Sequence, residues 1–214
     1  MEQLDGFRTI VISGHWNARI FTPDWVLENL CLGAPDTVIE VAVDLAQPMY
    51  RLTFEGMNLH VGSSRIMVNP ARPLDDELLD RMGKLIDRVL EHLPHTPVSA
   101  MGINLRWVER QLEQDWIGLF RLPGARRFAD AGAEVGKTTA KWELLLAGRQ
   151  LNLTVEYVPD DASMVIDFNF HTDLRDTQHA RRQLADGVRE YQTLAERMLA
   201  HIVGGDGHEG NSDE

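Results

Sequence analysis

LDDELLDRMGKLIDRVLEHLPHTPVSAMGINLRW, residues 74–107, is the stretch that decides the fold, because it joins a long helix pattern to a strand pattern. Its first part repeats apolar residues at three- and four-residue spacing, which predicts one apolar stripe along a helix. The stripe consists of Leu78, Leu79, Met82, Leu85, Ile86, Val89 and Leu93. Pro94 and Pro97 then end the helix. Apolar residues from Met101 to Trp107 alternate with other residues, as they do in a half-buried strand.

Upstream of this stretch, alternating apolar residues predict a series of strands. We expect a bent strand or hairpin within residues 7–20 and a short helix that starts at Thr22 and Pro23. Four strands should follow between Ile39 and Val68, separated by turns at Gly56 and at residues 62–64. The sequence therefore predicts an antiparallel meander that leads into the helix of residues 74–93.

Downstream, the same order of elements recurs. Strands are expected at residues 141–147, 151–158 and 163–171, and a second long helix should begin near Asp176 and continue to Ile202. We interpret the recurrence as an internal duplication within a single α+β domain of residues 1–205, with units at 1–95 and 96–205; chance similarity of pattern is the alternative. The predicted fold is an antiparallel sheet built from two similar strand/short-helix/strands/long-helix units, with two long helices packed on one face. Residues 206–214 contain no apolar side chain, so we expect a disordered acidic tail.

Composition limits the classes of function. The chain has 214 residues, of which 25% are charged, and its formal net charge of -12 opposes general binding to nucleic acid. It shows neither an apolar run long enough for a membrane helix nor a signal-peptide pattern, which predicts a cytoplasmic location and no membrane partner. The single cysteine, Cys31, lies among leucines as a small core residue would.

Polar residues in two predicted strands form the first candidate site. One face of the strand at 163–171 carries Asp167, Asn169 and His171, in line along the strand. Together with Asn104 and Arg106 these side chains could bind a ligand or a partner. The simpler alternative is that this face of the sheet meets water.

An insertion in the second half, residues 118–139, forms the second candidate site. Arg126 and Arg127 lie within a run of arginines and aromatic residues, which suits a phosphate, a nucleic acid or a protein partner. Arginine stems that cover apolar surface are the alternative. Residues Ala131–Thr138 have the spacing of a phosphate-binding loop with alanine in place of the first glycine, but no buried strand pattern precedes them.

We therefore predict a non-catalytic, cytoplasmic protein-binding or assembly protein of the adaptor type, with a protein partner and the option of a homodimer. The candidate binding residues are Asn104, Arg106, Arg126, Arg127, Asp167, Asn169 and His171. The first alternative is a small-ligand-binding protein or enzyme with a pocket on the polar sheet face. The second is a nucleic-acid or nucleotide binder that uses residues Arg121–Thr138. The sequence predicts no catalytic residue, metal ligand set or cofactor.

Overall fold

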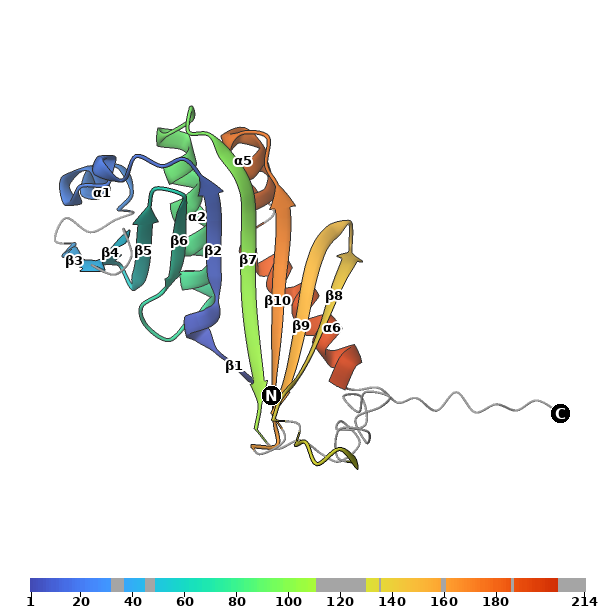
Figure 1. Cartoon of the computed structure of the whole chain (residues 1–214). Helices are drawn as coiled ribbons and strands as arrows, with labels where there is room; N and C mark the ends of the chain where they lie inside the picture. Colours follow the sequence, from blue (N-terminus) through green and yellow to red (C-terminus); the bar gives the residue numbers. More distant parts are fainter. Residues whose placement is uncertain are drawn as a thin grey trace.

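The computed structural model describes residues 1–31, 37–44, 49–110, 130–134, 136–158, 161–185 and 187–203. Within these ranges, ten strands form one sheet and four α-helices accompany it (Figure 1). The strands are β1 (Glu2–Gln3), β2 (Thr9–Gly14), β3 (Glu40–Asp44), β4 (Met49–Phe54), β5 (Met57–Gly62), β6 (Arg65–Pro70), β7 (Val98–Glu109), β8 (Thr138–Leu146), β9 (Arg149–Val158) and β10 (Ser163–Asp173). The helices are α1 (Pro23–Asn29), α2 (Asp76–His92), α5 (Thr177–Ala185) and α6 (Val188–Val203), with 3-10 turns η1 (Asp5–Phe7) and η2 (Ala18–Ile20). All described strand pairs are antiparallel, so the predicted α+β class with an antiparallel sheet is confirmed.

Strands β2 and β7 lie together in the middle of the sheet. The order across it is β3-β4-β5-β6-β2-β7-β10-β9-β8, with the short β1 also beside β7. Read inward from its outer side, the first half runs β3-β4-β5-β6-β2 and the second half runs β8-β9-β10-β7, so β3 has no counterpart in the second half. Apart from the short β1, the strand that comes first in the chain in each half is innermost, and the last strand of the following meander pairs with it.

Local sequence explains where two of the helices begin. The hydroxyl of Thr22 accepts a hydrogen bond from the Trp25 N–H at 3.2 Å, and Pro23 follows as the first helical residue of α1. The Asp75 carboxylate accepts the Leu78 N–H at 2.7 Å and caps α2. Its hydrogen bonds with Arg72 and then with the Leu78 N–H lower the pKa of Asp75.

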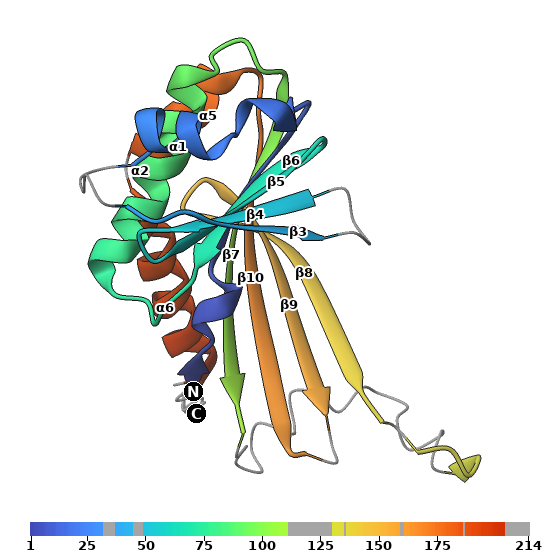
Figure 2. The same cartoon turned by 90° about the vertical axis from the view of Figure 1, so that its left-hand side faces the viewer.

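One face of the sheet carries the core. Its buried residues include Ile12 of β2, Leu59 of β5, Ile103 of β7 and Phe168 of β10. In Figure 2, α2, α5 and α6 lie to the left of the strands, on the side that this core occupies. Tyr191 of α6 is buried and packs edge-on against Phe170, with ring centroids 5.2 Å apart.

The prediction of one long helix from about Asp176 to Ile202 is wrong, because this stretch forms two helices, α5 and α6. Gly187 separates α5 from α6 and has a φ of +84°, a left-handed conformation that ends a helix. The expected bent strand or hairpin at residues 7–20 is one strand, β2, flanked by the two 3-10 turns. The predicted tail at 206–214 lies outside the described residues.

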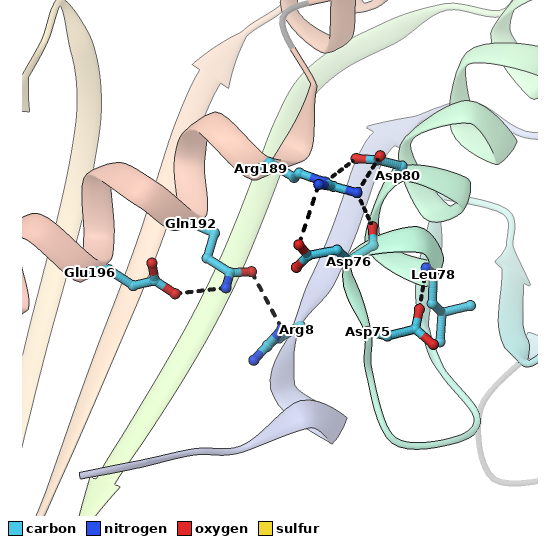
Figure 3. A network of polar contacts seen from close by, with 8 residues as sticks. All are labelled: Arg8, Asp75, Asp76, Leu78, Asp80, Arg189, Gln192 and Glu196. Carbon is cyan, nitrogen blue, oxygen red and sulfur yellow. Dashed lines mark hydrogen bonds and ion pairs between the residues drawn. The ribbon is translucent and has the colours of Figure 1, made fainter.

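Arginines of the last two helices bind the acidic side of α2. Arg189 of α6 donates to Asp80 at 2.8 Å and to the backbone carbonyl of Asp76 at 2.9 Å (Figure 3). Arg181 of α5 donates to both carboxylate oxygens of Asp87, at 2.7 and 3.1 Å. These contacts join the end of the second half to the helix of the first.

None of the helices in the described ranges is both long and apolar enough to cross a membrane.

Candidate functional site

A row of polar side chains crosses the sheet on the face opposite the core. Each strand of the nine-strand path contributes one residue, and cross-strand register places each beside the next. The register of β2 with β6 pairs Ile10 with Val68, and one further step along both strands brings Thr9 beside Asn69. We call this set the polar row: Glu40, Thr53, Asn58, Asn69, Thr9, Asn104, Asn169, Asn152 and Glu143.

Amide groups in the second half of the polar row are hydrogen-bonded in series. Asn152 donates its side-chain N–H to the Asn169 oxygen at 3.1 Å, and Asn169 donates to the Asn104 oxygen. Asn104 in turn donates to the Thr9 hydroxyl at 2.8 Å. All four side chains are half-buried, and a chain of aligned amides in such a setting is held more rigidly than isolated surface amides.

The first half of the row has its own contacts. Thr53 donates its hydroxyl to the Asn58 side-chain oxygen at 2.7 Å, and the Asn58 and Asn69 amides both donate to the Pro70 carbonyl, at 3.4 and 3.1 Å. The Asn69 oxygen lies 2.8 Å from Nε2 of His60. Burial lowers the pKa of His60, and the nearby Arg51 and Arg65 act in the same direction against the bond to Asn69. The imidazole therefore favours the neutral form beside the row.

Arg106 and Asp167 form an ion pair next to the row. The two residues lie opposite each other in β7 and β10, and the guanidinium binds both carboxylate oxygens, with Nη2 at 2.8 Å from Oδ2. The side chain of Arg106 also covers the Phe7 ring, with 4.0 Å from Cζ to the ring centroid. The bond to Asp167 raises the pKa of Arg106. This geometry fixes a planar, charged group on the open face.

The structure brings together five of the seven candidate binding residues. Asn104 and Asn169 are members of the polar row, and Arg106 and Asp167 form the adjacent ion pair. His171 lies opposite Gly102 on the same face, with Nε2 at 3.1 Å from the Asp173 carboxylate. The other two candidates, Arg126 and Arg127, lie outside the described residues.

Sequence reasoning missed most of the polar row. Asn58, Asn69 and Asn152 each lie between two buried apolar residues, and Thr9 precedes the buried Ile10; this alternation identified their strands but gave no reason to group them. A cross-strand register was needed, and register depends on which strands become neighbours. The signal within the sequence was a polar residue in each strand on the side away from the apolar positions.

The described cavity lies away from this face. A cavity of about 670 Å³ opens between α2 and α5, where Asp80, Lys84, Arg181 and Leu184 are among its lining residues. In the described part of the chain, no group of three or more His, Cys, Asp or Glu side chains is placed to hold a metal ion. Burial raises the pKa of the Cys31 thiol, and the charge of Glu55 adds to this shift, so the thiol form is favoured over a nucleophilic thiolate.

The segment that resembles a phosphate-binding loop leads into a strand. Thr138 is the first residue of β8, whereas a phosphate-binding loop leads into a helix whose N-terminus faces the phosphates. The Lys137 ammonium lies 3.2 Å from the Glu156 carboxylate, so it is paired within the protein. The described end of this segment therefore lies at the start of an edge strand, β8.

No protein-family model and no curated protein matches this chain.

Proposed function

We propose that this chain is a non-catalytic protein-binding protein of the assembly or adaptor type, and that the open face around the polar row holds its protein partner. The carrying observation is that nine neighbouring strands each present one polar residue in register. No described helix lies over this face (Figure 2). A rigid hydrogen-bonding surface of this width, with neutral amides and hydroxyls along its centre, suits a polypeptide partner better than it suits a small ligand.

Two properties of the row favour binding over catalysis. The Asn104 and Asn169 amides bond to each other and Asn104 also bonds to Thr9; a carboxamide has no basic group that takes up a proton near neutral pH. Arg106 is similarly engaged by Asp167 and carries a fixed charge. Preorganised side chains of this kind lose little rotamer freedom when a partner binds, which favours affinity.

We further propose that the two halves arose by internal duplication, with α2 and α6 as equivalent helices packed on the same face. The order of four strands matches on either side, β4-β5-β6-β2 in the first half and β8-β9-β10-β7 in the second, which supports this relation. In addition, superposing the halves strand on strand pairs Asn58 with Asn152 and Asn69 with Asn169, when Thr9 is matched to Asn104. In that case the polar row would derive from a shorter row in the single ancestral unit that was duplicated.

A photo-crosslinking amino acid at Gln150 tests the binding proposal. Gln150 is exposed, lies on the open face of β9 and pairs with His171. We expect ultraviolet light to produce, in cells of the source organism, a discrete adduct heavier than the chain that contains a second, different protein. The adduct should weaken when Asn152→Ala removes one amide of the row.

The matched control carries the same amino acid at Arg197, an exposed position of α6 on the opposite side of the molecule. Equal crosslinking from both positions, or no adduct from Gln150, would contradict binding through the open face.

A further inference from the structure

Strand β8 ends the sheet at the side of the second half and exposes apolar residues there. Among the described strands it pairs with β9 alone. Trp142, on the core side, is 44% exposed, and Leu145, on the open side, is 78% exposed. An edge strand with unpaired backbone groups and exposed apolar side chains is a template for another strand.

The hairpin between β8 and β9 determines which backbone groups of β8 point outward. Ala147 and Gly148 form a two-residue turn, with φ values of 49° and 77° that are typical of a type I′ turn. Such a turn makes Leu146 and Arg149 a hydrogen-bonded pair, and hydrogen-bonded pairs alternate along the strand. Trp142 therefore bonds inward to β9, and the backbone N–H and C=O groups of Lys141 and Glu143 point outward.

Charges of opposite sign stand on either side of Trp142. Lys141 and Glu143 are exposed on the open face, and neither takes part in an ion pair among the described residues. Antiparallel pairing of two identical strands about a residue places the position before it opposite the position after it. An axis at Trp142 thus brings each lysine opposite a glutamate.

We propose that β8 pairs with β8 of a second copy of this chain, antiparallel and with the two-fold axis at Trp142. The two tryptophans then face each other as a non-hydrogen-bonded pair, in which side chains lie closest. Each Lys141 forms a hydrogen-bonded pair with Glu143 of the second copy, so two ion pairs flank the axis. The indoles cover each other and the partly buried Leu144 on the core side.

The two-fold registers next to this one are less favourable. An axis at Lys141 would place two lysines opposite each other, and an axis at Glu143 would do the same with two glutamates; like charges directly opposite are destabilising. A two-fold axis between two residues would pair a residue whose side chain lies on the core side with one whose side chain lies on the open side, so the two sheets would not continue with matching faces. Charged residues on an edge strand often prevent it from pairing with another strand. Here the residue before Trp142 is positive and the residue after it is negative, so two antiparallel copies place opposite charges beside each other. This inference is independent of the proposed partner on the open face.

Charge reversal tests both the pairing and its register. We expect the wild-type chain at about 100 μM to sediment with twice the mass of the 24.2 kDa monomer. K141E and E143K should each raise the dissociation constant by about tenfold or more, since each replaces two attractive pairs with two repulsive ones. An equimolar mixture of K141E and E143K should restore the dimer, because the acidic edge of one chain faces the basic edge of the other.

Disulfide trapping gives an independent measure of register. In a Cys31→Ser background, Trp142→Cys should form an intermolecular disulfide, because Cα atoms of a non-hydrogen-bonded pair are about 4.5 Å apart. Leu144→Cys is the control and should not, since its own copy lies far along the strand. A monomeric wild type, an unimpaired K141E dimer, or a mixture that stays monomeric would overturn the proposal. Circular dichroism of each variant confirms that it is folded.

Discussion

Asn104 and Asn169 hold the centre of the polar row because each bonds on both sides. Asn104 donates to Thr9 and accepts from Asn169, which also accepts from Asn152. Asn152, at the end of the series, makes one of these bonds. The stabilising effect of each amide should therefore follow its position in the series.

We predict that Asn104→Ala and Asn169→Ala each lower the free energy of unfolding by about 2 kcal/mol, and Asn152→Ala by about 1 kcal/mol, at about 1 kcal/mol per bond. Urea denaturation of the three variants measures the order. Equal effects at all three positions would show that the amides act separately.

Tyr50 lies in β4, in the first half of the sheet, and makes stability depend on pH. Its hydroxyl donates to the Ala18 carbonyl and lies 3.3 Å from that of Phe21, and burial raises the pKa of Tyr50 to about 12. An ordinary tyrosine in the unfolded chain ionises near pH 10. The folded state thus retains its proton longer, so the contribution of Tyr50 to stability is complete below about pH 10 and is lost as the pH rises toward 12.

Spectrophotometric titration of tyrosinate should show this late ionisation in the wild type and not in Tyr50→Phe. The free energy of unfolding should also fall less steeply above about pH 10 in the variant. Identical alkaline slopes in the two proteins would contradict the assignment.

Sequence patterns predicted the faces of residues but not their neighbours. Alternation along residues 99–107 and 163–171 placed Asn104, Arg106, Asp167 and Asn169 away from the apolar positions. That Asn104 lies opposite Asn169, and Arg106 opposite Asp167, depends on the pairing of β7 with β10. This pairing joins distant segments, and no short-range pattern encodes its register.

At the scale of elements, α2 and the α5–α6 pair differ in how well the sequence predicted them. The apolar stripe of α2 is continuous from Leu78 to Leu90, so periodicity alone identified the helix. In the second half the stripe continues across Gly187, and the periodicity hid the break. The dipeptide Asp186-Gly187 was the available turn signal.

Gly187→Ala should lower the free energy of unfolding by about 1 kcal/mol, because the left-handed backbone strains a residue with a Cβ atom. A Cβ at Gly187 meets no atom within 4 Å, so the effect comes from the backbone alone. Gly6→Ala is the matched control, since that site is equally open and its φ is outside the left-handed region; its stability should be unchanged or slightly higher. Equal stability of the two variants in urea denaturation would refute the argument.

At the scale of the whole molecule, the two halves share one core and one sheet. The β2–β7 pair joins the strands, and Arg181 and Arg189 join the last helices to α2. We predict that circular dichroism and tryptophan fluorescence report a single thermal transition. The double change Arg181→Ala, Arg189→Ala should lower its midpoint without splitting it, because half-exposed ion pairs contribute only about 0.5 kcal/mol each. Two separate transitions in either protein would show that the halves unfold independently.

The central place of β7 also affects how the chain is made. The ribosome releases residues 98–109 well before residues 163–173, which form β10, and before α6. During that interval one side of β7 has no neighbouring strand, and Met101, Ile103 and Leu105 lack part of their cover. A nascent chain in this state exposes both an unpaired strand and apolar surface, the combination that leads to aggregation. Synthesis that stalls between β7 and β10 should therefore yield insoluble protein, and chaperones that bind apolar segments should act on the chain during this period.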